Sequence, residues 1–490
     1  MLYISTRGKT DMVSSAHAIS NGLAADGGLF VPKEFPPISL AEIDAMREAP
    51  YSARALTVLA RFLTDYSEDE LKNCVETAYS KERFGDFPAP LHLLKDNLDV
   101  LELWHGPTCA FKDMALQILP LFLTKAVQKT GEQKKLVILV ATSGDTGKAA
   151  MAGFADVPET EVIVFYPQEG VSDIQKLQMV TQRGANVHAV AVEGNFDDAQ
   201  TGVKRVFGDG AIAAELAKRN IRLSSANSIN WGRLVPQVVY YFAAYAQLLK
   251  AGKISFGDKV DFCVPTGNFG DILAGYYAKQ MGLPVGKLVC ASNENNVLTD
   301  FLTTGTYTAK REFFKTTSPS MDILVSSNLE RLLYHVTGSD TEVAALMKSL
   351  AETGSYTVRP ETLRTIQESF ACGWSSEEQV AGEIRARYEK DGYLCDTHTA
   401  VAFHVAAQKK RDGVPMVVLS TASPFKFPRS VLEALGHTAP ENDFEAMQAL
   451  EEATGRTAPA SLAVLRQKAE RFSTVIDPAQ IAEVALGCQA

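Results

Sequence analysis

Residues 98–127 read LDVLELWHGPTCAFKDMALQILPLFLTKAV and decide the fold, because a strand, a loop and a helix follow one another there. Apolar residues predict a strand over 98–104, and apolar residues at helical spacing predict a helix over 114–127 with a kink at Pro120. Lys112 closes the loop between them, near the N-terminus of the helix. Because the positive end of a helix dipole disfavours a cation, Lys112 is expected to be solvated, paired with an anion, or partly deprotonated for chemistry.

The alternation of short strands and helices continues to about residue 292 and predicts an α/β fold built on parallel sheet. Further strands are expected at residues 136–141, 162–166, 187–192, 261–264, 287–291 and 416–419. Residues 326–410 are expected to be mainly helical. Ligands bind such sheets at the carboxyl ends of the strands, so the residues that follow each strand are the candidates for a functional site.

Composition argues against several classes of function. The chain has 490 residues and a net charge of -10, which argues against nucleic acid or an anionic membrane as its main partner. Its apolar runs are too short to span a bilayer, and residues 1–8 contain no basic region followed by an apolar stretch, so a cytoplasmic protein is expected. The seven cysteines are scattered without a Cys-x-x-Cys pair, which predicts reduced thiols and no structural zinc.

The loop Gly267-Asn268-Phe269-Gly270-Asp271 leaves the strand at 261–264 and enters a helix that runs to about residue 281. Successive backbone N–H groups in such a turn, together with the helix N-terminus, form a concave site that suits a phosphate. The alternative is an ordinary turn between a strand and a helix.

Two further loops also suit anions. Residues 142–149, TSGDTGKA, lack the first glycine and the final hydroxyl residue of a nucleotide P-loop, because Thr142 and Ala149 stand there, so ATP or GTP hydrolysis is not expected. This loop is either a plain turn or a run of hydroxyl and N–H groups that holds a substrate carboxylate. Residues 227–233, NSINWGR, include Arg233, whose forked donors match a phosphate; the alternative is a capped helix start with a solvated arginine.

A lysine at a strand exit, a glycine loop for a phosphate and a hydroxyl residue after a late strand are the parts needed to hold pyridoxal phosphate. Lys112 would bond to the cofactor, and the 267–271 loop would hold its phosphate. Thr421, which follows the strand at 416–419, would meet the ring nitrogen. The alternative for Thr421 is a turn hydroxyl bonded to its own backbone.

Taken together, five motifs resemble the threonine synthase family. They are HGPTCAFKD at 105–113, ATSGDTG at 141–147, NSINWGR at 227–233, PTGNFGD at 265–271 and the turn-rich GLAADGGLFVP at 22–32. The resemblance implies an α/β fold of type II among the pyridoxal-phosphate enzymes and the conversion of O-phospho-L-homoserine and water to L-threonine and phosphate, the last step of threonine biosynthesis. It implies an N-terminal domain over 1–97, α/β domains over 98–260 and 261–430 with the cofactor between them, and a C-terminal helical extension over 431–490.

The resemblance also implies roles for single residues. Lys112 corresponds to the Schiff-base lysine and Thr421 to the partner of the ring nitrogen. The cofactor phosphate is assigned to Gly267, Asn268, Phe269, Gly270 and Asp271. The substrate carboxylate is assigned to Ser143, Gly144 and Thr146, and the substrate phosphate to Asn227, Ser228 and Arg233. Asp145 would contact the cofactor hydroxyl, although many relatives in the wider fold have Asn there.

Two rival functions remain open from the sequence. A lyase on the same fold would release 2-oxobutyrate from the same substrate, and a non-catalytic relative would bind ligands on the same scaffold. His398 and His404 are not expected to bind a metal, because their spacing does not align two side chains on one helix face. The expected partner is the small-molecule substrate, and the expected state is a monomer or a homodimer.

Overall fold

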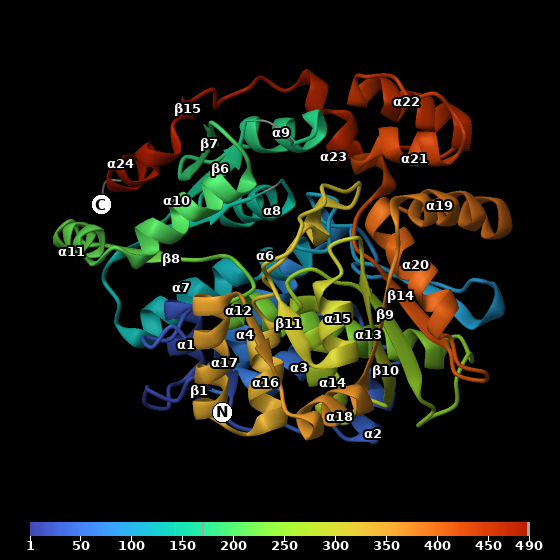
Figure 1. Ribbon diagram of the computed structural model, residues 1–490, viewed down its shortest axis with the longest axis horizontal. Helices are drawn as coiled ribbons and strands as arrows, with labels where there is room; N and C mark the ends of the chain where they lie inside the picture. Colours follow the sequence, from blue (N-terminus) through green and yellow to red (C-terminus); the bar gives the residue numbers. More distant parts are fainter. Residues whose placement is uncertain (143, 169–170, 488–490) are drawn as a thin grey trace.

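The computed structural model describes residues 1–142, 144–168 and 171–487, and it contains two large sheets (Figure 1). The first has six strands in the order β13 (Phe370–Trp374), β10 (Val285–Ser292), β9 (Val260–Pro265), β14 (Met416–Ser420), β4 (Leu98–Glu102) and β3 (Leu91–His92). Its first five strands pair in parallel, and β3 pairs with β4 in the antiparallel sense. The predicted α/β fold is therefore confirmed.

The second sheet has five strands, all paired in parallel, and lies in the upper lobe of Figure 1. Its order is β15 (Val475–Ile476), β7 (Val187–Val192), β6 (Thr160–Pro167), β5 (Lys135–Ala141) and β8 (Ile221–Ser224). The helices beside this sheet include α8 (Asp145–Phe154), α9 (Asp173–Val180), α10 (Phe196–Gly208), α11 (Gly210–Lys218) and α24 (Ile481–Leu486).

Alternate residues of the strands in the six-stranded sheet face two different helical layers, as period-2 side-chain geometry requires. On β9, Phe262 and Val264 belong to the same core cluster as α13 (Val238–Lys250) and α14 (Gly270–Gln280), whereas Cys263 packs with α20 (Thr397–Lys409). Helix α13 is apolar on nearly all sides and almost completely buried, which is the pattern of a helix inside a large core.

The expected helix over 114–127 is two helices, α6 (Asp113–Leu116) and α7 (Leu119–Thr130). Pro120 has no N–H with which to continue the helical hydrogen bonds to Leu116, so the chain breaks just before it and starts again. The short α6 leaves Lys112 as its N-cap residue.

Residues 1–90 hold a small antiparallel sheet and several helices, but their apolar side chains share one core cluster with the six-stranded sheet. Their elements are β1 (Tyr3–Ser5), α1 (Ser15–Asn21), β2 (Phe30–Pro32), α2 (Leu40–Ala45), α3 (Tyr51–Phe62), α4 (Glu68–Ala78) and α5 (Lys81–Phe84). The 3₁₀ turn η1 (Lys95–Asn97) joins β3 to β4.

The remaining elements belong to the central part of the chain or to its C-terminal segment. The central ones are α12 (Trp231–Leu234), η2 (Val235–Gln237), α15 (Val297–Thr304), β11 (Thr306–Thr308), η3 (Pro319–Met321), α16 (Leu329–Thr337), α17 (Asp340–Thr353), β12 (Ser355–Thr357), α18 (Pro360–Ser369) and α19 (Glu377–Asp391). The last ones are η4 (Pro424–Lys426), α21 (Pro428–Ala434), α22 (Asp443–Thr454), α23 (Ala460–Ala463), η5 (Leu465–Gln467) and η6 (Pro478–Gln480). Among the described residues, no helix is long and apolar enough to cross a membrane.

The division of the chain into domains stays a prediction, but the observed strands depart from the sequence expectations in three places. Strand β4 lies in the same sheet as β9 and β14, so residues 98–102 do not group with the five-stranded sheet. Residues 431–490, expected to be helical, add β15 to the edge of that sheet. Residues 326–410 contain β13, an edge strand whose five residues are too few to stand out from the helices around it.

Candidate active site

Parallel pairing brings the exits of β4 and β14 together. The Phe111 N–H donates to the Thr421 carbonyl oxygen at 2.8 Å, and Ala110 and Ala422 form an isolated antiparallel bridge. Lys112 and Thr421, which are far apart in sequence, therefore lie on two loops that are hydrogen-bonded to each other.

Lys112 is buried and paired. Its Nζ lies 3.2 Å from Ser320 Oγ, 3.6 Å from Asp145 Oδ2 and 4.9 Å from the centroid of the Phe111 ring. Burial lowers the pKa of Lys112 to about 8, although the Asp145 carboxylate favours its charged form. Lys112 is therefore not solvated: it is paired with an anion, and its lowered pKa makes the ammonium easier to deprotonate.

Asp145, the first residue of α8, lies between two lysines. Its Oδ1 accepts from Lys426 Nζ at 2.5 Å and from Gln175 Nε2 at 3.1 Å, while Oδ2 faces Lys112 and Ser320. Burial opposes the ionisation of Asp145, but the charges of Lys426 and Lys112 hold its pKa well below its usual range. Asp145 is therefore a carboxylate in the folded protein.

The glycine loop at 267–271 is held by the segment that precedes α16. Ser326 Oγ donates to the Gly267 carbonyl oxygen at 2.6 Å, and the Asn328 N–H donates to the Asn268 carbonyl oxygen at 3.0 Å. Phe269 adopts a left-handed conformation with φ 65°, and Gly270 then begins α14. At Gly267 an added Cβ would lie 2.8 Å from the Ser320 carbonyl oxygen, so this position admits no side chain.

The side chain of Asp271 is used to hold two helices together. Its Oδ1 accepts from the hydroxyls of Tyr240 and Tyr241, both on α13. Burial raises the pKa of Asp271 to about 6, although the tyrosine hydroxyls favour its ionised form. The Asp271 side chain is thus engaged by the two tyrosines and offers no donor to an anion in this loop.

Arg233 provides a buried cation for an anion. Its side chain is almost completely buried on α12, and its Nε and Nη1 have no hydrogen-bond partner among the described residues. Burial lowers the pKa of Arg233 only to about 10, so it remains charged near neutral pH. Since buried N–H groups are nearly always paired, these donors indicate an anion site.

The other residues predicted for the substrate have different environments. Ser228 is buried and its Oγ accepts from Asn328 Nδ2 at 2.8 Å, whereas Asn227 is exposed. Gly144 is buried and Thr146 is half-buried, both at the start of α8. Ser143 lies outside the described residues.

Thr142, which was not assigned a role in advance, organises the same turn. Its Oγ1 accepts from the N–H groups of Gly144 and Gly147, both at 3.0 Å. These two N–H groups are therefore already used inside the protein and are not free donors for a substrate carboxylate.

Four more residues at this site were missed by the sequence analysis. Lys426 follows Thr421 by five residues and could have been noticed as a second lysine after a strand, but Ser320, Gln175 and Asn328 belong to no motif. His398 is buried near the start of α20, where its Nδ1 bonds to Asp396 and its Nε2 accepts from the Ser320 N–H at 3.2 Å. It thus has a core role, as expected.

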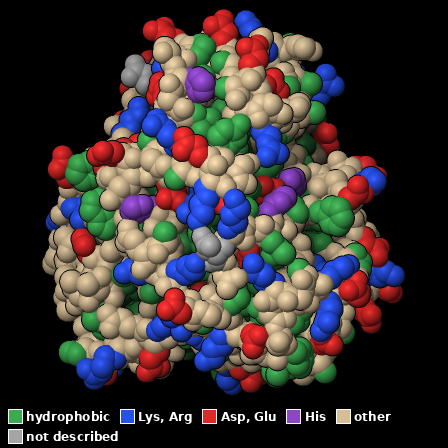
Figure 2. Space-filling view, turned by 90° about the vertical axis from the view of Figure 1, so that its right-hand side faces the viewer, with side chains coloured by type: hydrophobic (Ala, Val, Ile, Leu, Met, Phe, Trp, Pro, Cys, Tyr) green, Lys and Arg blue, Asp and Glu red, His purple; other side chains and the backbone are tan. Residues whose placement is uncertain are grey.

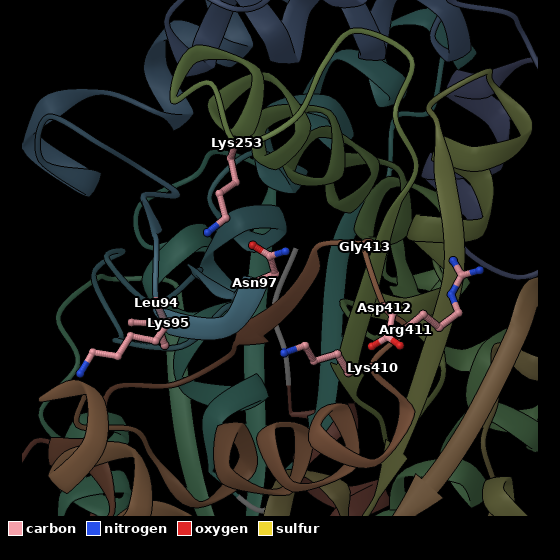
Figure 3. Close-up of a pocket in the computed structure, with 8 residues that line it drawn as sticks. All are labelled: Leu94, Lys95, Asn97, Lys253, Lys410, Arg411, Asp412 and Gly413. Atoms are coloured by element: carbon pink, nitrogen blue, oxygen red, sulfur yellow. The ribbon is translucent and has the colours of Figure 1, made fainter.

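A hollow of about 640 Å³ lies at the other ends of the strands of the six-stranded sheet, near the amino ends of β4 and β14 (Figure 3). Of the four cationic residues that line it, two are paired with a carboxylate: Arg411 forms a fork on Asp261, and Lys253 lies 3.7 Å from Asp99. The buried polar side chains that lie close to one another are found at the carboxyl ends of the strands and not in this hollow.

Lysine and arginine side chains also occur around the middle of the face drawn in Figure 2, although the chain as a whole is acidic.

Three family models match nearly the whole chain. A model described as threonine synthase N terminus matches residues 2–79, one described as pyridoxal-phosphate dependent enzyme matches residues 90–368, and one described as threonine synthase, C-terminal, matches residues 399–485. Threonine synthase of Schizosaccharomyces pombe is 40% identical over 466 residues, covering 88% of this chain and 89% of that protein. The chain belongs to the threonine synthase family. Pyridoxal phosphate is the cofactor of this family.

Solved structures of the threonine synthase family have the same fold. Pyridoxal-phosphate-bound threonine synthase from Brucella melitensis superposes with a TM-score of 0.88 at 40% identity, covering 99% of both chains. Yeast threonine synthase gives a TM-score of 0.87 at 34% identity, covering 99% of this chain and 97% of that chain. Threonine synthase-like 1 of Homo sapiens is 43% identical over 86% of this chain, but the chain spans only 58% of the length of that relative.

Proposed function

We propose that this protein is a threonine synthase that converts O-phospho-L-homoserine and water to L-threonine and phosphate. The observation that carries the proposal is a buried site that combines the Lys112 amine with the Arg233 guanidinium, whose Nε and Nη1 have no hydrogen-bond partner among the described residues. The amine suits attachment of a carbonyl compound, and the guanidinium suits a phosphate. Membership of the threonine synthase family supports this choice of substrate.

The residues present fit pyridoxal phosphate. Lys112 would bond to it, the 267–271 loop would hold its phosphate, and the Thr421 hydroxyl would face its ring nitrogen. The buried Lys112 amine supports this assignment, because burial lowers its pKa to about 8 and the neutral amine is the form that bonds to a carbonyl group. When bound, the cofactor supplies an electron sink for negative charge at the substrate α-carbon.

Lys112 is proposed to move the protons of the reaction. With a pKa of about 8, about a tenth of its amine is neutral at pH 7 and can accept a proton from the substrate α-carbon. Ser320 and Asp145, at 3.2 and 3.6 Å from Nζ, would hold the resulting ammonium in place until the proton is returned.

Arg233 is proposed to bind the substrate phosphate with Asn227 and Ser228, and to hold it as it leaves. Thr146 at the start of α8 is proposed to hold the carboxylate together with Ser143, whereas the Gly144 N–H is already used by Thr142 Oγ1. Asp145 is proposed to contact the cofactor hydroxyl. Charge-assisted hydrogen bonds of this kind hold the substrate in one orientation, from which the proton of its α-carbon and then its phosphate can leave. A monomeric or homodimeric state and a cytoplasmic location stay predictions.

The test compares Lys112→Ala with Lys250→Ala, whose lysine is exposed and pairs with Glu48 on the surface. We expect Lys112→Ala to lose both the visible absorption band of the lysine-bound cofactor and the formation of threonine, while Lys250→Ala keeps both. Retention of threonine formation by Lys112→Ala would reject the assignment.

A further inference from the structure

A second lysine, Lys426, is completely buried against the Asp145 carboxylate. Its Nζ lies 2.5 Å from Asp145 Oδ1 and donates to the Thr108 carbonyl oxygen at 3.0 Å. Both partners are out of water, with exposed fractions of 0% for Lys426 and 4% for Asp145. A buried ion pair is costly to desolvate and is weak evidence for a stabilising role, so its position in the molecule needs another explanation.

The position of the pair links three segments around the reacting lysine. Asp145 begins α8 in the upper lobe, Lys426 ends the 3₁₀ turn that follows Thr421, and Thr108 lies four residues before Lys112. The second oxygen of Asp145 faces Lys112 Nζ at 3.6 Å and accepts from Ser320 Oγ at 3.4 Å. The carboxylate is therefore shared between two cations, one of which would be bonded to the cofactor.

We propose that Lys426 is a positioning residue that holds the Asp145 carboxylate beside Lys112, so that Asp145 and Lys426 act as one neutral unit at the reacting nitrogen. The inference rests on the proposed function only in that Lys112 binds the cofactor. Without Lys426, the Asp145 charge would be unbalanced whenever Lys112 is not an ammonium. Without Asp145, the Lys426 charge would face Lys112 directly.

Other charged residues around the Asp145–Lys426 pair lie on α8 and on neighbouring elements, and they are left unchanged in every variant of the test. Arg233 on α12 and Asp271 on α14 interact electrostatically with Lys112, and Asp113 on α6 and Lys148 on α8 interact with Lys426. The two members of the pair have opposite signs, so their removal should move the Lys112 nitrogen in opposite directions.

The experiment is a double-mutant cycle of Asp145→Asn, Lys426→Met and the two together. Cofactor-free protein is titrated with pyridoxal phosphate, and the pH midpoint of the visible band of the Lys112-bound cofactor is measured. We expect Lys426→Met to raise the midpoint, because a negative charge favours the protonated nitrogen, and Asp145→Asn to lower it. Each single change should weaken cofactor binding about tenfold or more, and the double change should restore both quantities to within about threefold, or half a pH unit, of the parent.

Circular dichroism checks that each variant is folded. Lys426→Arg keeps the positive charge and is the control for the charge itself, so the pH midpoint of its visible band should stay close to that of the parent. Additive losses in the double variant, or midpoints that shift in the same direction in both single variants, would overturn the proposal, as would a parent protein that binds no pyridoxal phosphate. A parent that binds the cofactor but forms no threonine would overturn the proposed function and leave this cycle intact.

Discussion

The close contact between α6 and α8 sets the distance between Lys112 and Asp145, because each of these residues stands at the start of one helix. Gly153 on α8 makes this contact: a Cβ added there would lie 2.0 Å from the Leu116 carbonyl oxygen of α6. The carbonyl oxygen is held by backbone on both sides and cannot turn away as a flexible side chain would. Gly153→Ala must therefore push the two helices apart.

The size of the effect follows from the geometry. Ordinary contact for a Cβ begins at 3.4 Å, so the two groups would have to separate by about 1.4 Å. Overpacking of this kind costs about 3 kcal/mol at the upper end of the usual range, and alanine recovers about 1 kcal/mol of helix propensity over glycine. We expect Gly153→Ala to lower the free energy of unfolding by about 2 kcal/mol and to weaken cofactor binding, because Lys112 and Asp145 move apart.

Urea denaturation of the cofactor-free protein and titration with pyridoxal phosphate measure these two effects. Gly382→Ala is the matched control, since Gly382 lies inside α19 and an added Cβ there meets no atom of the described residues within 4 Å. It should be neutral or stabilise by up to about 1 kcal/mol. If Gly153→Ala proves as stable as Gly382→Ala, the helices do not approach each other as described.

Three further predictions follow from the charged groups. Arg233→Met should raise the KM for O-phospho-L-homoserine at least about tenfold with less effect on the visible band of the cofactor, and an unchanged KM would remove Arg233 from the substrate site. Cofactor should rebind to cofactor-free protein at a rate that rises with pH and levels off above about 8, the pKa of Lys112, and a rate still rising at pH 10 would contradict this assignment. Burial opposes the ionisation of Glu102, but His105 and His92 outweigh it and lower its pKa to about 2. The stability that Glu102 contributes is then complete above its unfolded pKa of about 4.3 and is lost as pH falls toward about 2, so Glu102→Gln should flatten the urea-measured stability profile over that range.

The sequence was sufficient to predict the strand exits because parallel strands place their carboxyl ends at one edge. Lys112 and Thr421 were expected to meet on that argument, and their loops are hydrogen-bonded to each other. Loops whose residues form motifs, such as 267–271, could be found in the same way. Arg233 was expected as a phosphate ligand, and its burial without a described partner strengthens that prediction.

Other features depend on contacts that leave no local pattern. Ser320 reaches Lys112 across 208 residues of sequence, and its segment contains no motif that predicts this contact. The order of the strands, which joins β4 to β14 instead of β5, is set by packing over the whole chain and not by the residues of β4. The break before Pro120 could have been predicted more firmly, because a proline removes the very hydrogen bond that would have continued α6.

The most direct test of the account is to incubate the cofactor-loaded protein with O-phospho-L-homoserine and measure threonine, phosphate and 2-oxobutyrate in the same reaction. The account predicts threonine and phosphate in equal amounts, with 2-oxobutyrate a minor product. Phosphate accompanied by an equal amount of 2-oxobutyrate and no threonine would instead identify a lyase, and the absence of phosphate release would identify a non-catalytic relative; either result would contradict the proposed function.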